Sequence, residues 1–184
     1  MKKIIITLTA LICTASLINA QKLFSRAAYL GFYSNTKMED IKADNNKANV
    51  VLDVPTGAIE ISGLVKSFEF EKALMQEHFN ENYMESDKFP KTTFKGKIDN
   101  LAAVNFTKDG TYNSKVTGDL TMHGVTKKVT VDGIFKVAQG KVTCESKFFV
   151  VPEDYNITIP NTVRDNIASK IEITFKANLE ELKK

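Results

Sequence analysis

The feature that most constrains the fold is a regular alternation of apolar and polar residues in the C-terminal half of the chain. Residues 171–179 follow it without a break, and residues 94–98 and 126–138 show the same pattern. Successive side chains of a strand point to opposite faces, so a period of two predicts a strand with one apolar and one solvated face. Such one-sided strands are typical of antiparallel sheets, because parallel sheets are covered on both faces.

Short turn sequences separate the alternating segments. Asp109-Gly110 is a strong hairpin signal, and His123-Gly124 and Gln139-Gly140 follow it at similar spacing. Successive strands joined by tight turns predict a meander. The predicted strands are residues 23–34, 47–54, 57–63, 94–98, 101–107, 112–122, 126–138, 141–151 and 171–179.

Residues 71–84 interrupt the strand pattern. The segment contains good helix formers and places Met75, Phe79 and Tyr83 on one stripe. We predict a single helix or a few helical turns here, ending before Phe89-Pro90. About eight strands with one apolar face each predict a closed barrel or a sandwich in one domain, and the solvated outer faces favour the barrel.

The start of the chain has the composition of a secretory signal peptide. Two lysines precede an apolar run over residues 4–18, and the small residue Ala20 stands before polar sequence. This order predicts cleavage after Ala20 and a periplasmic or secreted protein. A membrane anchor is the alternative, but the run is short for a stable span. We therefore expect a signal peptide over residues 1–20 and one domain over residues 21–184.

Composition argues against several classes of function. The formal net charge is +3 and no basic run occurs, so nothing favours nucleic-acid binding. His78 and His123 are the only histidines, which excludes a metal site built on several imidazoles. No calcium loop, nucleophile elbow or glycine-rich phosphate loop is present, although spacing alone leaves a serine–histidine–aspartate triad open. Cys144, the only cysteine after residue 20, excludes an intramolecular disulfide. We therefore expect no catalytic residues, no metal and no cofactor.

Residues 118–133, GDLTMHGVTKKVTVDG, gather polar groups around His123. Parity separates these groups, because Leu120 and the other apolar residues share one face while Asp119 points to solvent. Gly124 can adopt a positive φ, which places the turn at His123-Gly124. We interpret the stretch as a barrel hairpin that contributes an apolar wall, with His123 at its corner.

The same hairpin is similar to the glycine–Asp–Leu–Thr–x–x–Gly–Val–Thr–Lys–x–Val motif of the YceI-like family, secreted bacterial proteins that bind lipids or polyisoprenoids. SDKFPKTTFKGKI (86–98) resembles the family's Tyr/Phe–Pro–x–x–Thr–Phe segment, and EDYNITI (153–159) resembles its Asp–Phe–Gly–Ile stretch. The resemblance covers residues 57–180. It implies an all-β fold: an antiparallel, eight-stranded, lipocalin-like β-barrel with one short helical segment. It also implies a lumen that holds an isoprenoid or fatty chain, and no catalytic residues.

Together, these observations predict a non-catalytic binding protein that encloses a long apolar chain, a polyisoprenoid, fatty acid or fatty amide. Parity and the helical stripe give the candidate lumen residues. The alternative for any one of them is that it fills a packed barrel interior. The candidates are Phe79, Tyr83, Phe94, Ile98, Leu120, Met122, Val129, Val131, Phe148, Val150, Ile173 and Phe175.

Two other functions stay open at this point. One is an enzyme acting on a lipid or quinone-like substrate, with His78 as a general base. That role requires a carboxylate or hydroxyl within about 3 Å of the imidazole. The other is a stress-response or adhesion module with a solid barrel and protein partners. Exposed edge strands would also permit a homodimer.

Overall fold

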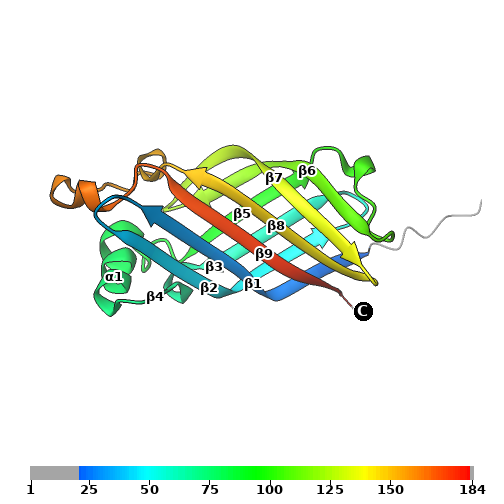
Figure 1. Ribbon diagram of the computed structural model, residues 1–184, viewed down its shortest axis with the longest axis horizontal. Coiled ribbons are helices and arrows are strands. Elements are labelled where there is room, and N and C mark those ends of the chain that lie inside the picture. The colour runs from blue at the N-terminus through cyan, green and yellow to red at the C-terminus, as the bar shows by residue number, and fades with distance from the viewer. Residues whose placement is uncertain (1–20, 183–184) are drawn as a thin grey trace, which may run out of the picture.

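Eight long strands close into an antiparallel barrel in the computed structural model of the chain, which describes residues 21–182 (Figure 1). The strand order is β1-β9-β8-β7-β6-β5-β3-β2, and β2 pairs back with β1. The predicted signal peptide lies outside the described residues. The barrel strands are β1 (Lys22–Asn35), β2 (Asp40–Asp53), β3 (Ala58–Leu64), β5 (Lys91–Ile98), β6 (Gly110–Met122), β7 (Val125–Ala138), β8 (Lys141–Val150) and β9 (Ile171–Glu181).

The predicted fold class is therefore confirmed, including the number of barrel strands.

Short elements complete the chain around the barrel. A ninth strand, β4, adds to β2 through the pairs of Phe70 with Ala43 and Glu69 with Asp44. The barrel closes through the pairing of β1 with β2, but residues 125–132 of β7 pair with β6 alone, so the possible homodimer stays a prediction. The short elements are β4 (Glu69–Phe70), α1 (Ala73–His78), a π-helical turn (Phe79–Tyr83) and 3-10 helices at Val65–Ser67, Leu101–Ala103, Pro152–Tyr155 and Asn161–Asn166.

Two of the predicted hairpins form at the expected residues. His123 and Gly124 have φ of 47° and 73° between β6 and β7, and Gln139 and Gly140 have φ of 52° and 74° between β7 and β8. Two successive residues with positive φ give the turn twist that matches the right-handed twist of the flanking strands. The register of both hairpins follows from these turns, and it runs unbroken from Met122↔Val125 to Gly110↔Val137 along β6 and β7.

The predicted strand over residues 101–107, and with it a hairpin at Asp109-Gly110, is wrong. Leu101–Ala103 form a 3-10 helix, and β5 pairs directly with β6. The carboxamide oxygen of Asn105 accepts hydrogen bonds from the backbone N–H groups of Thr107 (2.9 Å) and Lys108 (3.1 Å). This side-chain turn gives the backbone an alternative to strand pairing.

The strand predicted over residues 47–54 is also longer than expected, because β2 begins at Asp40. Its first half contains few large apolar residues, which hid the alternation. The inward positions there are instead small or amide side chains: Ala43, Asn45 and Ala48 are all fully buried. Asn45 is satisfied inside the barrel, where its side-chain N–H donates to the carbonyl oxygen of Leu64 at 3.1 Å.

The predicted helical segment is confirmed, with α1 and the π-helical turn lying at one end of the barrel (Figure 1). We call this end the rim. Residues 35–40 between β1 and β2, and residues 161–170 before β9, lie at the same end. Ser34, near the end of β1, holds the segment before β9 in place, because its buried hydroxyl oxygen accepts a hydrogen bond from the backbone N–H of Ala168 at 2.9 Å.

The opposite end of the barrel is packed solid. Leu52 and Ile98 are almost completely buried there, and Leu101 lies against Gly57 beside Ile98. The ring of Phe106 meets the ring of Phe135 edge-on, with 5.7 Å between centroids. The loop that was predicted as a strand therefore supplies the plug of this closed end.

Candidate ligand-binding cavity

A cavity of about 310 Å³ occupies the rim half of the barrel. Its surface is almost entirely apolar, and the residues that line it come from all eight strands of the barrel. On β8 alone, the lining runs from Val150 through Phe148 and Ser146 to Cys144, which corresponds to about 20 Å of strand. The volume and apolar lining are those of a small-molecule site, and the shape suits an elongated ligand.

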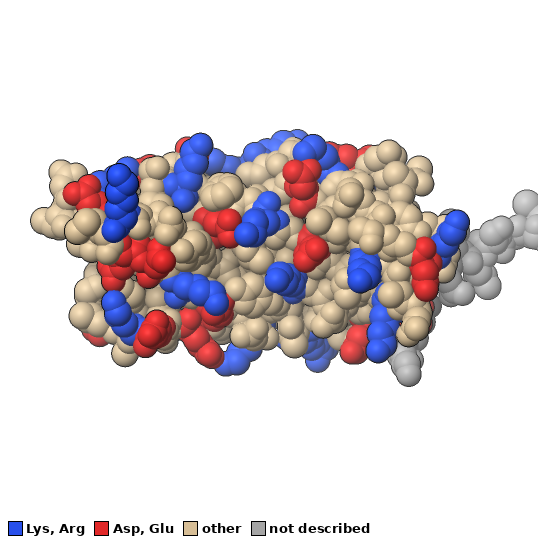
Figure 2. All heavy atoms as spheres, in the orientation of Figure 1, with Lys and Arg blue, Asp and Glu red and all other residues tan. Residues whose placement is uncertain are grey.

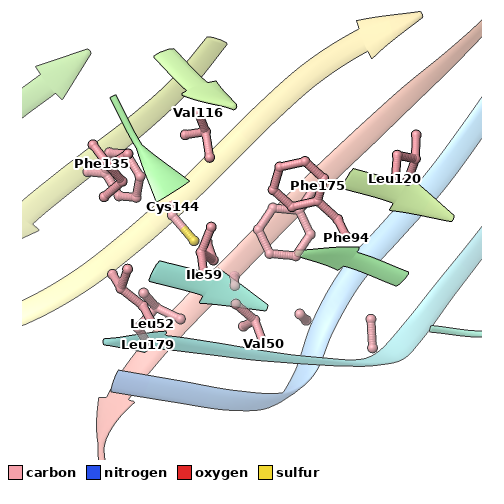
Figure 3. Close-up of a cluster of buried hydrophobic side chains, with 14 of the residues drawn as sticks. Val50, Leu52, Ile59, Phe94, Val116, Leu120, Phe135, Cys144, Phe175 and Leu179 are labelled. Atoms are coloured by element: carbon pink, nitrogen blue, oxygen red, sulfur yellow. The ribbon is translucent and has the colours of Figure 1, made fainter. Parts of the chain in front are cut away.

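The inward side chains show that this space is not filled by protein. Val131, Phe148 and Ile173 point inward yet are only partly buried, whereas inward residues nearer the closed end are fully buried. Their residual surface faces the cavity. In Figure 3, Val116, Phe135 and Cys144 point into the interior from different strands, and all three are buried at the cavity floor.

The structure places ten of the twelve candidate lumen residues on the cavity wall. Ile98 is not among them, because it is buried in the plug of the closed end. Val129 packs against the core without reaching the cavity. Lys127, on the same face of β7, pairs with Asp154 at 2.8 Å, so the segment after β8 covers this part of the strand. The ten lining residues are Phe79, Tyr83, Phe94, Leu120, Met122, Val131, Phe148, Val150, Ile173 and Phe175.

Four phenylalanines, which we call the rim aromatic cluster, line the cavity near α1. Phe79 from the helical segment stacks on Phe32 of β1, with 5.3 Å between centroids and 27° between planes. Phe70 and Phe68 lie 5.1 Å and 5.7 Å from Phe79. Only Phe79 was predicted for the site. Phe32 lies on β1, Phe70 on the two-residue strand β4 and Phe68 in the connection before β4. The two positions around β4 are too short a segment for a periodic pattern to mark a lumen face.

Residues 152–167 also line the cavity, and sequence analysis missed them. Pro152, Ile157, Ile159, Val163 and Ile167 all contribute side chains to the wall. Their signal was present as apolar residues at irregular spacing between β8 and β9. Because the spacing is irregular, it does not indicate which side of the segment is buried. Only the three-dimensional path of the segment assigns these residues to the lumen.

Several polar groups of the cavity lie near its rim, and Ser146 lines it closer to the floor. Glu39 accepts hydrogen bonds from the Lys72 ammonium at 3.0 Å and from the Asn166 amide at 3.2 Å. These two donors hold the pKa of the Glu39 carboxyl below its ordinary value. The phenol of Tyr83 also lines the wall, and burial raises its pKa. A ligand with one polar end would therefore place that end at the rim and its apolar part toward Cys144.

His78 also lines the cavity, but its ring is exposed on α1. No carboxylate or hydroxyl of the described residues hydrogen-bonds to this ring. The partner that a general base requires is therefore not provided by residues 21–182. In the same part of the chain, no group of three or more His, Cys, Asp and Glu side chains is arranged to hold a metal ion.

His123, which was placed at a hairpin corner, joins three segments beside the cavity. Its Nε2 lies 2.6 Å from the Glu85 carboxylate, and its Nδ1 lies 3.1 Å from the carbonyl oxygen of Tyr155. Each nitrogen faces an oxygen that accepts hydrogen bonds, so the ring donates to at least one of them. Phe89 packs edge-on against the imidazole at 4.7 Å. The ring thus fixes the residues that follow the helical segment and those that follow β8.

Replacing His123 by Ala is expected to lower the free energy of unfolding by about 2–3 kcal/mol, because a largely buried ring loses its polar contacts with Glu85 and Tyr155. Urea unfolding followed by circular dichroism measures this change. His78→Ala is the matched control and should stay within about 0.5 kcal/mol, since that ring is exposed. Equal effects of the two substitutions would contradict the structural role of His123.

Cys144 at the cavity floor gives a second prediction. Burial raises the pKa of its thiol from 9.0 to about 12. Above pH 9.0 the unfolded chain therefore releases a proton that the folded chain keeps, so stability falls as pH rises through this range. The fall is about 1.4 kcal/mol per pH unit for one proton.

Urea unfolding at several pH values on both sides of 9.0 measures this slope. Cys144→Ala is expected to be less stable than the parent below pH 9.0, and its stability should fall less steeply above pH 9.0, by about the 1.4 kcal/mol per pH unit of one proton. The Tyr29 phenol, whose pKa burial and Asp44 raise to about 12, contributes equally to both proteins. Identical slopes would show that the thiol is not protected by the fold.

The outer surface differs from the cavity in chemistry. On the face shown in Figure 2, basic and acidic side chains are interspersed and form no field of one sign. None of the helices in residues 21–182 has the length and apolar character needed to cross a membrane.

Comparison with known proteins agrees with this geometry. A family model described as "YceI-like domain" matches residues 24–179. No curated protein matches the sequence. Among solved structures, a polyisoprenoid binding domain from Saccharophagus degradans, implicated in plant cell wall breakdown, superposes with a TM-score of 0.75 at 14% identity and covers 88% of this chain and 98% of its own.

Two further structures share the fold. Burkholderia cenocepacia BcnA gives a TM-score of 0.68 at 17% identity, covering 83% of this chain and 96% of its own. The YceI protein of Campylobacter jejuni gives 0.53 at 18% identity, with both chains covered completely. At these identities the likeness concerns the fold.

Proposed function

The chain belongs to the YceI-like family, and on that premise we propose that it is a non-catalytic binding protein that encloses one long apolar chain in its barrel. The observation that carries the proposal is the unfilled, almost entirely apolar cavity that begins at the rim and ends at a packed floor. Each methylene group moved from water into such a site contributes about 0.8 kcal/mol. A long chain therefore binds tightly without any specific polar contact.

The ligand class that fits best is a polyisoprenoid, and a fatty acid or fatty amide is the second. The similar domain from Saccharophagus degradans is described as polyisoprenoid-binding, which supports the first class. The predicted signal peptide supports a periplasmic or secreted location. Glu39, Asn166 and Tyr83 at the rim provide hydrogen-bonding groups for a polar end of the chain.

The two competing functions have less support. A solid-barrel module is disfavoured by the cavity itself, because Val131, Phe148 and Ile173 keep free surface inside the barrel. The enzyme hypothesis lacks a hydrogen-bonding partner for His78 among the described residues. If His78→Ala abolished turnover of a lipid or quinone-like substrate by the protein, the enzyme hypothesis would replace our proposal.

Uptake of a fluorescent chain by the delipidated protein tests the proposal. The sequence contains no tryptophan, so cis-parinaric acid can be followed in solution with little background. We expect saturable binding of one molecule per barrel, and displacement by geranylgeraniol. Failure of both chains to bind would contradict the proposed function.

A further inference from the structure

The rim carries the opening of the cavity. His78 on α1 lines the cavity and is also exposed, so the lumen meets solvent beside this helix. Glu39 from the β1–β2 connection lines the same part of the wall. The hydrogen bond from Lys72 to Glu39 at 3.0 Å joins that connection to the start of α1.

Large apolar side chains stand exposed around this opening. Met38 is 71% exposed beside Glu39, and Leu74 is 61% exposed two residues after Lys72. Leu74 precedes His78 by one helical turn, so it lies on the side of α1 that borders the opening. Phe149, 61% exposed, adds an aromatic side chain to the outer wall where β8 reaches the rim. The apolar surface of the lumen thus continues outward onto the rim.

Charged side chains of both signs accompany these residues. Lys37 is adjacent to Met38, and Lys170 precedes β9 at the same end; neither forms an ion pair within residues 21–182. Asp40 and Asp165 lie at the same end, while Glu71 and Glu77 line a separate polar groove on α1. Apolar anchors with neighbouring lysines are typical of surfaces that insert into the headgroup region of a bilayer.

We propose that the rim docks onto a phospholipid bilayer through Met38 and Leu74, so that the apolar chain passes between bilayer and lumen without crossing bulk water. This inference rests on the proposed function. Moving the chain from the lumen into water costs about 0.8 kcal/mol of transfer free energy for each methylene group. Loading from solution is therefore slow for a long chain, and contact with the phase that dissolves it removes this barrier.

A bilayer fits this surface better than a second copy of the chain. The exposed apolar side chains are separated by the charged residues Lys37, Glu39 and Lys72. A stable dimer requires a continuous interface of at least about 1,200 Å². Anchoring in a bilayer requires only that separate apolar side chains reach below the phosphates, where nearby lysines contact the headgroups.

The test compares two double variants of the full mature chain. Met38→Glu with Leu74→Glu places two charges on the rim. Val51→Glu with Ile134→Glu is the matched control, because these side chains are exposed on the outer wall nearer the closed end. Transfer of a chain is measured as the rate at which protein removes geranylgeraniol from vesicles of phosphatidylethanolamine and phosphatidylglycerol.

We expect the rim variant to transfer the chain about tenfold more slowly or worse, while the control stays within about twofold of the parent protein. The transfer rate of the parent should also rise in proportion to vesicle concentration. Binding of cis-parinaric acid from solution should be the same in all three proteins, since neither pair lines the cavity. Equal transfer rates for the two variants would overturn the docking inference, whereas absence of solution binding in the parent would overturn the proposed function itself.

Discussion

Val131→Trp is expected to weaken binding of an apolar chain by at least about a hundredfold while the barrel stays folded. Val131 points into the cavity from β7 and is paired with Val116 near the cavity floor. An indole at this position occupies the volume that a ligand would use. If even four methylene groups are excluded from the lumen, the binding free energy is weakened by about 3 kcal/mol. This raises the Kd by about a hundredfold.

Thr130→Trp is the matched control for this prediction. Thr130 is the preceding residue of the same strand, exposed on the outer face, where its hydroxyl contacts that of Thr117 at 2.9 Å. The same aromatic group outside the barrel should leave the Kd for cis-parinaric acid within about threefold, because strand exteriors accept aromatic residues. Circular dichroism checks that both variants are folded. Unchanged binding in folded Val131→Trp would place the ligand somewhere other than the lumen.

Gly118→Ala is expected to destabilise the barrel by about 3 kcal/mol or more. Gly118 on β6 is opposite Gly96 on β5. A Cβ at Gly118 would lie 2.4 Å from the Cα of Gly96 and 2.4 Å from the carbonyl oxygen of Lys95. Because both contacts are with backbone atoms, no side-chain rotation relieves them, and the two strands must separate.

The same pair of glycines makes room for a residue of the cavity wall. A Cβ at Gly118 would lie 2.8 Å from the ring of Phe94, and a Cβ at Gly96 would lie 2.5 Å from the same ring. Gly118→Ala is therefore also expected to displace Phe94, so that chain binding weakens in whatever fraction remains folded. Glycines at such positions allow tight bending of a barrel wall.

Gly140→Ala separates this steric effect from the general cost of replacing glycine. A Cβ at Gly140 would have no atom within 4 Å, but the φ of this residue is +74°. Replacing it by alanine should lower the free energy of unfolding by about 1–2 kcal/mol, only because alanine is strained in the left-handed backbone conformation. Urea unfolding measures both variants. A smaller loss at Gly118 than at Gly140 would contradict the close packing of β5 against β6.

Most of the barrel could be predicted from the sequence because its strands are one-sided. Alternation identifies β6 to β9, and the turns at His123-Gly124 and Gln139-Gly140 fix how three of these strands pair. The first half of β2 escaped prediction because its buried positions are Ala43, Asn45 and Ala48 rather than large apolar residues. The hairpin signal at Asp109-Gly110 was misleading for residues 101–107, since the apolar side chains of that loop plug the barrel end instead of forming a wall.

The cavity could be predicted only in part, because parity gives the face of a residue and not its depth. Ile98 and Phe94 share the inward face of β5, yet Ile98 lies in the plug and Phe94 lines the lumen. Depth depends on which distant segments close each end. At the rim, for example, Glu39 and Asn166 are brought together from opposite ends of the chain.

Native mass spectrometry of the protein purified from its natural host, followed by lipid extraction, tests the central claim most directly. We expect the parent protein to carry one apolar chain per barrel, and Thr130→Trp to retain it. Val131→Trp should be free of lipid under the same conditions. A parent protein that is consistently lipid-free, and that also fails to take up geranylgeraniol in vitro, would contradict the proposal that the barrel encloses an apolar chain.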